Sequence, residues 1–174
     1  MIKRLYNILL TLDATLLMLV VFFANIESHL VFGINKWCVV LCLCVIILIL
    51  TRFSIFVCRY LSDDSIENGV IEIESANNTF LPVYLGYFFV ALGISDYCTM
   101  LFVYGIVFIF TYLSRAMYFN PIFLLFGFQF YYVVNVNGIK CFVISKQTLR
   151  DTESIYFSSL KRINTTTYID MEER

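Results

Sequence analysis

The chain has 174 residues, of which 60% are hydrophobic, 18% are aromatic and only 14% are charged. A soluble domain of this length needs a mostly polar surface, which this composition does not supply, so the sequence predicts an integral membrane protein. The formal net charge of −1 excludes the basic excess that binding to nucleic acid phosphates requires. We therefore expect no direct binding to nucleic acid.

Two long apolar runs predict transmembrane helices over residues 5–24 and 37–58. Each run has about 20 residues, the length that crosses a hydrocarbon core about 30 Å thick. The polar connection between them leads into Trp37, an aromatic residue suited to the membrane interface. Thr51 and Arg52 mark the cytoplasmic end of the second helix, or else a charge that reaches the headgroups.

The first helix carries a polar stripe. Asn7, Thr11 and Thr15 lie about one helical turn from one another or from Asp13, so they are placed to face the interior of a helix bundle. An ionisable group such as Asp13 is costly near the membrane centre and indicates a function such as ion passage or subunit coupling. The alternative is a protonated or hydrogen-bonded packing residue, with Arg52 as a partner if it turns inward. We favour packing and assembly over conduction.

A polar loop over residues 60–78 follows, and its alternating stretch 70–74 predicts a short strand. Residues 80–113 are then apolar apart from Ser95-Asp96, a stretch too long for one span but suited to a tight hairpin of two helices. The two predicted helices cover residues 80–94 and 97–113. The glycines expected to let helices pack closely are Gly86, Gly93 and Gly105.

The residues after the last span favour β-structure. Asn120-Pro121 breaks the helix, and the aromatic and β-branched residues of 123–136 predict a strand. Asn137-Gly138 favours a type I′ turn into a return strand over 139–146, and the earlier short strand is a candidate third member of this sheet. Residues 147–174 carry no strong period, so we expect a partly ordered tail.

Together these elements predict an all-α membrane protein of four transmembrane helices with a small cytoplasmic β-hairpin or sheet. The transmembrane region covers residues 1–116 and includes the cytoplasmic loop, and the cytoplasmic hairpin and tail cover residues 117–174. The basic residues near the span ends fall on one side, apart from Lys36, which predicts that both termini are cytoplasmic. The residues on the cytoplasmic side are Lys3, Arg4, Arg52, Arg59 and Arg115.

The sequence shows no arrangement typical of catalysis or of cofactor binding. Its single histidine, His29, lies on the outer connection, and no glycine-rich loop precedes a helix. The six cysteines lack the paired spacing of a zinc site. We therefore expect that the chain is not an enzyme and has no catalytic residue, cofactor or metal.

Three stretches carry a resemblance to a known family. They are Arg4-Leu5-Tyr6-Asn7 leading to Thr11-Leu12-Asp13-Ala14-Thr15, the block FLPVYLGYFFVALGI over residues 80–94, and the hairpin segment from Asn120-Pro121 to Val143-Ile144-Ser145-Lys146. Over most of its length the chain resembles the KwaA family, the membrane subunits of the Kiwa anti-phage defence system.

The resemblance implies a membrane-embedded sensor and scaffold of a two-component defence system at the bacterial inner membrane. It also implies a homo-oligomer, with a tetramer as the expected state, that recruits a soluble DNA-binding companion protein of the KwaB type. Membrane lipid is the other expected partner. The docking candidates for the companion are basic residues of the hairpin and tail: Lys140, Lys146, Arg150, Lys161 and Arg162.

Two other functions are compatible with the residues. A small channel or pore-forming effector that depolarises the membrane would place Asp13 and its neighbours around a hydrated axis. A membrane immunity protein against a toxin also fits a small four-span chain with cytoplasmic tails. Ion leakage when the chain is expressed alone would favour the pore, and a neighbouring toxin gene would favour the immunity protein.

Overall fold

The computed structural model describes residues 2–31, 33–66, 70–79, 81–114, 120–148, 157 and 160–171. The chain divides into two compact units by its internal contacts. The helical unit consists of Arg4–Ser54 and Thr79–Asn120, and the sheet unit consists of Met1–Lys3, Ile55–Asn78 and Pro121–Arg174. Each unit is therefore assembled from segments that lie far apart in the sequence.

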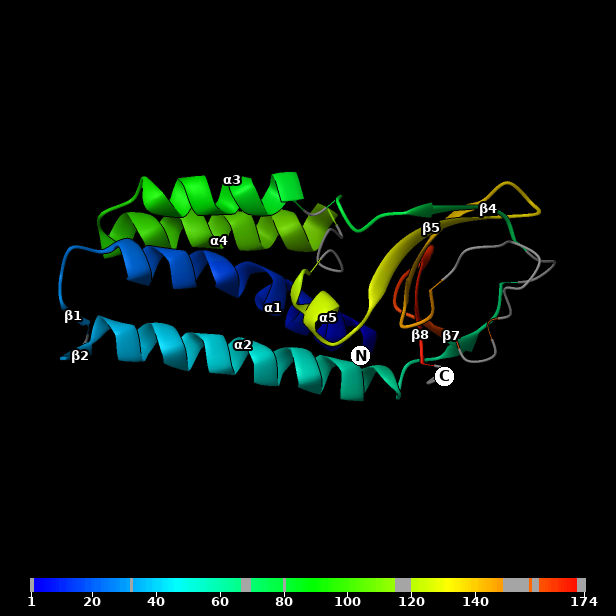
Figure 1. Cartoon of the computed structure of the whole chain (residues 1–174), viewed down its shortest axis with the longest axis horizontal. Helices are drawn as coiled ribbons and strands as arrows, with labels where there is room; N and C mark the ends of the chain where they lie inside the picture. The colour runs from blue at the N-terminus through cyan, green and yellow to red at the C-terminus, as the bar shows by residue number, and fades with distance from the viewer. Residues whose placement is uncertain are drawn as a thin grey trace. The chain divides into compact units, whose positions relative to one another are not determined.

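The helical unit is built on four helices, labelled in Figure 1. They are α1 (Ile2–Asn25), α2 (Lys36–Cys58), α3 (Leu81–Leu92) and α4 (Tyr97–Ser114). The strands β1 (Leu30–Val31) and β2 (Ile34–Asn35) form an antiparallel hairpin between α1 and α2. The long helices follow from mostly apolar sequence, because the only hydrogen-bonded form that a lipid-facing single segment can take is a helix.

The predicted count of four transmembrane helices is wrong. Within the described residues, three helices are long and apolar enough to cross a membrane, namely Lys3–Asn25, Lys36–Cys58 and Tyr97–Ser114. The third predicted span, over 80–94, is the shorter helix α3 of 12 residues, about 18 Å at 1.5 Å per residue. Pro82 must lie in the first helical turn, since proline lacks the N–H that later turns need, and Gly93 forms the turn that ends the helix.

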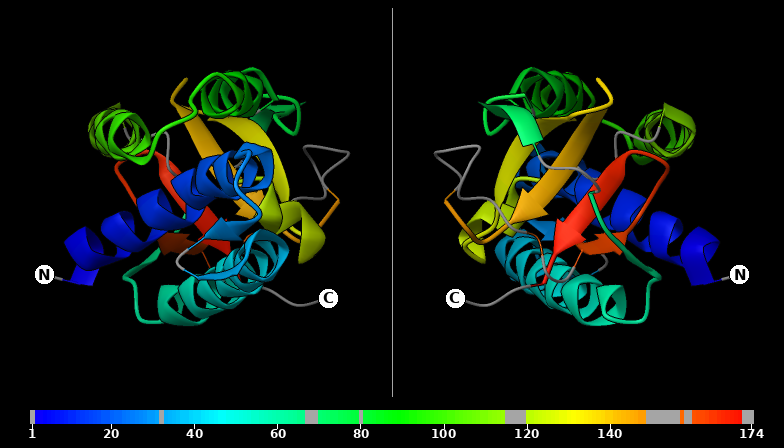
Figure 2. Two further views of the ribbon diagram at one scale, coloured as in Figure 1. Left: turned by 90° about the vertical axis from the view of Figure 1, so that its left-hand side faces the viewer. Right: turned by 90° about the vertical axis from the view of Figure 1, so that its right-hand side faces the viewer.

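Helix α1 lies between α2 on one side and the α3–α4 pair on the other (Figures 1 and 2). Toward the end of α1 that leads into the β1–β2 hairpin, apolar side chains from several elements pack into one buried cluster. Its members are Met18, Phe22, Ile26, Val31, Ala91 and Met100. The outward faces of α2 and α4 are also apolar, as expected of helices whose surroundings are lipid.

The sheet unit holds six strands and the short helix α5 (Ile122–Leu125). The strands are β3 (Asp63–Asp64), β4 (Val70–Ser75), β5 (Gln129–Asn135), β6 (Lys140–Ser145), β7 (Leu160–Arg162) and β8 (Thr167–Asp170). Their order is β3-β7-β8-β6-β5-β4, and the neighbours are antiparallel except for the parallel pair β6 and β8. The all-α class is therefore wrong, because the chain combines helices with a mixed sheet.

The β5–β6 hairpin surrounds the predicted turn at Asn137-Gly138, but its loop is longer than the two-residue type I′ turn. Val134 pairs with Lys140, and the Asn135 N–H donates to the Ile139 carbonyl at 3.1 Å. Three residues therefore form the loop. Gly138 takes a φ of +74°, the left-handed position that such three-residue loops require.

Within the tail predicted to be partly ordered, residues 160–162 and 167–170 form the strands β7 and β8. Residues 167–170 are all buried, since β8 lies inside the sheet between β7 and β6. A strand buried on both faces shows no alternation of polar and apolar residues. Strands of three and four residues also give a pattern too short to recognise. Their pairing partners β3 and β6 lie elsewhere in the chain and give no local signal.

Candidate functional site

Asp13 lies in the middle of α1 with no solvent-accessible surface. Its Oδ2 accepts hydrogen bonds from Thr51 Oγ1 at 2.7 Å and from Asn120 Nδ2 at 2.8 Å. Thr51 belongs to α2, and Asn120 is the last residue of the helical unit before the chain enters the sheet unit at Pro121. Thr51 and Asn120 are also fully buried, so these bonds form away from water, where unpaired polar groups are most costly.

The other carboxylate oxygen of Asp13, Oδ1, is buried and has no hydrogen-bond partner among the residues that the structure describes. A carboxylate offers about four lone-pair positions, and Thr51 and Asn120 use two of them. The arrangement can therefore accept a proton or one further donor at Oδ1.

Three consecutive residues of α1 bind the three other helices, and we call them the α1 polar segment (residues 13–15). Asp13 binds Thr51 of α2, as described above. The Ala14 carbonyl accepts a hydrogen bond from the Tyr84 hydroxyl of α3 at 2.9 Å, and the Thr15 and Tyr104 hydroxyls lie 3.1 Å apart, joining α1 to α4. Successive residues point about 100° apart around a helix axis, so this short segment reaches neighbours on several sides.

Helix α2 presents its few hydroxyl groups to the interior. Ile47, Thr51 and Ser54 are buried and lie three or four residues apart, hence on one helical face. The Ser54 hydroxyl donates to the Thr51 carbonyl at 2.8 Å. Arg52 is exposed, so the adjacent threonine, not the arginine, reaches the Asp13 carboxylate.

The other predicted residues of the α1 stripe are partly internal. The buried Thr11 hydroxyl donates to the Asn7 carbonyl at 2.7 Å, a bond within α1. Asn7 is half-buried, and its Oδ1 has no hydrogen-bond partner within the described residues. The structure therefore brings Thr11 and Asp13 into the interior, while the assignment of Asn7, Thr11, Asp13 and Arg52 to gating or assembly stays a prediction.

The glycines predicted to allow close helix packing do not touch a neighbouring helix in this chain. A Cβ added to Gly86 or Gly105 would meet no atom within 4 Å. At Gly93 it would lie 3.6 Å from carbonyl oxygens of Phe89 and Val90, which belong to the preceding turn of α3. A packing role for these glycines therefore stays a prediction about contacts with another molecule.

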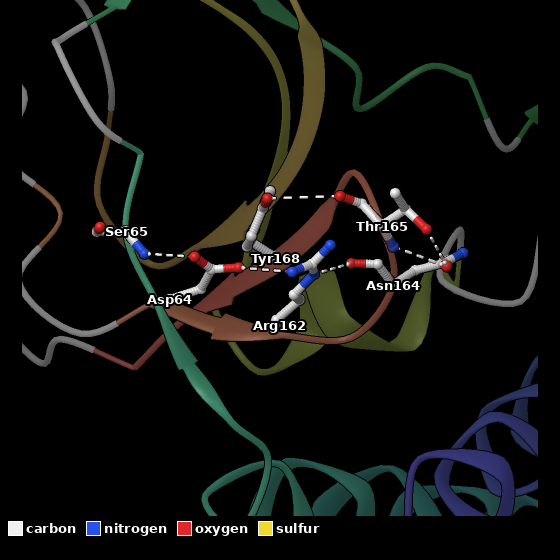
Figure 3. Close-up of polar contacts among 6 residues, drawn as sticks. All are labelled: Asp64, Ser65, Arg162, Asn164, Thr165 and Tyr168. Atoms are coloured by element: carbon white, nitrogen blue, oxygen red, sulfur yellow. Dashed lines mark hydrogen bonds and ion pairs between the residues drawn. The ribbon is translucent and has the colours of Figure 1, made fainter.

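Arg162 and Lys161 of β7 form ion pairs within the sheet unit. Arg162 Nη1 lies 3.4 Å from Asp64 Oδ2, and Arg162 Nε donates to the Asn164 carbonyl at 3.1 Å (Figure 3). Lys161 pairs with Asp63 of β3. Both basic residues of this strand therefore help to hold β3 and the β7–β8 turn.

The remaining docking candidates lie on or just after β6. Lys140 pairs with Glu74 at 3.2 Å and lies over the Tyr132 ring, 4.4 Å from its centroid. Lys146 is exposed and lies 5.3 Å from the centroid of the Phe128 ring. Arg150 lies outside the described residues. A docking role for any of these residues stays a prediction.

A second buried polar cluster joins β6 to β8. The Ser145 hydroxyl and the Gln147 side-chain amide both donate to Asp170 Oδ2, at 2.8 and 3.0 Å. Ser145 and Asp170 are almost fully buried, and the cluster bridges the parallel strand pair. Among the residues described, no group of three or more His, Cys, Asp or Glu side chains is placed to hold a metal ion, and the predictions about metals and catalysis stay predictions.

At the opposite end of α4 from Asn120, Asp96 caps the helix. The Thr99 N–H donates to Asp96 Oδ1 at 2.8 Å, as expected for an aspartate at a helix N-terminus. Hydrogen bonds from the Thr99 side chain and backbone hold the pKa of the Asp96 carboxyl below its ordinary value of 3.8. Asp96 therefore caps the N-terminal end of α4.

Sequence reasoning identified Asp13 but not its partners. Thr51 was interpreted as a helix end and Asn120 as a helix break, because each stands beside a stronger local signal, Arg52 or Pro121. Tyr84 lies in an apolar run in which its hydroxyl is easily overlooked. A signal was present nonetheless, because Thr51 is a polar residue between apolar turns of a membrane helix, where a buried partner is expected.

Comparison with known proteins gives one family. The model of a family described as anti-phage protein KwaA matches residues 6–169, nearly the whole chain. No curated protein and no solved structure matches the chain. The matched region includes Asp13, Thr51 and Asn120 as well as all eight strands labelled β1 to β8, apart from the last residue of β8.

Proposed function

Because the chain belongs to the KwaA family of anti-phage proteins, we propose that it is the membrane-embedded sensor and scaffold of a bacterial defence system. In this proposal it detects infection at the inner membrane and recruits a soluble DNA-binding effector of the KwaB type. Anti-phage defence is the property of the family. Sensing, scaffolding and recruitment are what the proposal adds.

One observation carries the proposal: Asp13 of α1 binds Asn120, the last residue of the helical unit before the segment Pro121–Arg174 of the sheet unit. A change in the packing of α1 against α2 alters the two hydrogen bonds that Asp13 Oδ2 accepts, one from Thr51 and one from Asn120. Asn120 is joined covalently to Pro121, and through it to α5 and β5 of the sheet unit. In this proposal, a movement of α1 relative to α2 is transmitted to the sheet unit through Asn120 and Pro121.

The proposed location is the inner membrane, with both termini in the cytoplasm. The strands β4 and β5, which precede and follow the α3–α4 pair, are hydrogen-bonded to each other, so this pair begins and ends on the same side of the membrane although α3 is short. The three long apolar helices support membrane association. The basic residues Lys3, Arg4 and Arg59 support the orientation, because positive charge accumulates on the cytoplasmic side. Lys36, the exception, donates from Nζ to the Ile26 carbonyl at 2.9 Å and so stabilises the C-terminal end of α1.

The test is a detergent pull-down of the tagged full chain from cells that express its genomic neighbours, with the native mass of the complex as a second readout. We expect a stoichiometric soluble DNA-binding protein bound to a homo-oligomer of the chain, a tetramer on the family likeness. Asp13→Ala is expected to retain membrane insertion but to lose phage protection in the same cells.

Two outcomes would instead support another function. If the purified chain alone makes liposomes permeable to ions, it is a pore-forming effector and the partner is dispensable. If it binds no DNA-binding protein but protects cells against a neighbouring toxin, it is an immunity protein. Recovery of the chain alone, with intact phage protection, would also contradict the recruitment step.

A further inference from the structure

Three polar side chains at the ends of the β1–β2 hairpin, which joins α1 to α2, bind the chain's own backbone, while His29 just before β1 is exposed. The Ser28 hydroxyl donates to the Leu30 carbonyl at 2.6 Å. Asn35 Oδ1 accepts from the Trp37 N–H at 3.0 Å and so caps the start of α2. With the Lys36 ammonium bound to carbonyls at the end of α1, these polar groups are satisfied without water.

The apolar side chains of the same region point outward. Leu30 is 59% exposed, Ile34 is 55% exposed and Trp37 is 56% exposed, whereas Val31 has no exposed surface and packs beneath them in the buried cluster. A hairpin surrounded by water would show the reverse pattern, since exposed loops are normally polar. The surroundings of this hairpin must therefore favour apolar groups.

The exposed apolar surface continues along α2. Trp37, Leu41, Val45 and Ile49 are spaced four residues apart, hence form one stripe, and all four are more than half exposed. With 23 residues, α2 is about 35 Å long, slightly longer than a hydrocarbon core of about 30 Å. Its first residue, Lys36, and the adjoining hairpin thus reach the interface between acyl chains and headgroups.

We propose that the β1–β2 hairpin lies within the lipid interface, with Leu30, Ile34 and Trp37 inserted among the upper acyl chains. The occupant of this surface is lipid, because the surface is continuous with the stripe of α2 that faces lipid in the proposed function. Tryptophan favours this layer, with its ring buried and its N–H close to the headgroups. The hairpin therefore anchors the α1–α2 turn to the bilayer and does not project into water.

The chain contains a built-in reporter, because Trp37 is its only tryptophan. Tryptophan can be moved within the full chain by combining Trp37→Phe with Leu30→Trp or with Ile34→Trp. Two matched controls are Trp37→Phe with Glu27→Trp, at an exposed polar position before the hairpin, and Trp37→Phe with Val45→Trp, on the α2 stripe. Circular dichroism and size exclusion in detergent select the variants that fold like the parent chain.

Each variant is reconstituted in liposomes and quenched either by acrylamide in the water or by lipids brominated near the headgroup or near the chain end. We expect the tryptophans at positions 30, 34 and 37 to be quenched most by the shallow bromines. The tryptophan at position 45 should respond to the deep bromines, and the tryptophan at position 27 to acrylamide.

The proposal is wrong if the tryptophans at positions 30 and 34 are quenched by acrylamide as strongly as the one at position 27. It is also wrong if neither acrylamide nor brominated lipid reaches them, because another protein surface then covers the hairpin. The position 45 reporter separates this result from a failure of the proposed function: deep quenching there shows that α2 lies in the bilayer even when the hairpin does not.

Discussion

The Asp13 carboxyl group holds two donors that come from distant parts of the chain, Thr51 and Asn120. All three side chains are fully buried. Removing the acceptor leaves both donors in an apolar environment, where each unsatisfied group costs about 1–3 kcal/mol. Thr51 has a second acceptor, the Ile47 carbonyl at 3.0 Å, which reduces its own loss.

We predict that Asp13→Ala lowers the free energy of unfolding by about 2–3 kcal/mol, since it removes two buried hydrogen bonds. Thr51→Val removes one donor and keeps the shape of the side chain. Because the two side chains are hydrogen-bonded to each other, we expect the two substitutions not to be additive, with a coupling of about 0.5–3 kcal/mol. Thermal or denaturant unfolding in detergent, compared for the parent chain, the two single variants and the double variant, measures this coupling.

Ser54→Ala is the matched control for Thr51→Val. Ser54 is buried on the same face of α2, but its hydroxyl donates to the Thr51 carbonyl and not to Asp13. Its effect should therefore add to that of Asp13→Ala. Additive effects for Thr51→Val as well would show that the two side chains do not interact in solution.

At the scale of elements, the start of α4 depends on an ionised Asp96. Its pKa lies below the ordinary 3.8 because Thr99 donates to the carboxylate. The folded state thus binds a proton less readily than the unfolded state, and the cap contributes stability above pH 3.8 that is lost as the pH falls through the lowered pKa.

We predict that Asp96→Asn flattens part of this acid dependence, because asparagine caps a helix but has no proton to gain in this range. The measurement is the midpoint of thermal unfolding from neutral pH to below 3.8, for the parent chain and the variant. Parallel curves for the two proteins would show that the cap contributes nothing to acid stability.

The β5–β6 loop depends on Gly138, whose φ of +74° is unfavourable for any residue with a Cβ. We predict that Gly138→Ala destabilises the chain by about 1–2 kcal/mol. Gly105→Ala is the control, because it lies in α4, where alanine is the better helix former and a Cβ meets no atom within 4 Å. Gly105→Ala should be neutral or stabilising in the monomer, and a loss of native mass would instead indicate a contact between copies.

For the whole molecule, the parts that the sequence predicts well are those with local signals. Long, mostly apolar stretches identified α1, α2 and α4, with small errors at their ends. The alternating stretch at 70–74 became β4, and the Asn-Gly pair lies in the β5–β6 loop. The predicted length of α3 was wrong, since the apolar run continues through Gly93 while the helix ends at Leu92.

The parts that depend on distant residues were not predictable in the same way. The partners of Asp13 are 38 and 107 residues away. The parallel pairing of β6 with β8 has no local signal either, because both strands are buried on both faces. The candidate site was therefore predicted only in part. Asp13 could be identified because a carboxylate is costly in a membrane, whereas its donors Thr51 and Asn120 could be identified only from the folded structure.

We predict that Asp13→Asn protects cells from phage better than Asp13→Ala does. Asparagine keeps one oxygen acceptor of similar position for Thr51 or Asn120, whereas alanine keeps none. Plaque counts on cells that carry the defence genes, at matched membrane levels of each variant, give the comparison. Equal protection by the two variants would separate the Asp13 network from defence and leave it a purely structural feature.

The place of β8 in the sheet has a consequence for how the protein is made. β8 spans residues 167–170, after every other described strand, yet it lies between β7 and β6 rather than at an edge. During synthesis the helices leave the ribosome first, so they are available for insertion while the sheet still lacks its internal strand. A message cut before codon 167 would therefore give the cell inserted helices without a complete sheet.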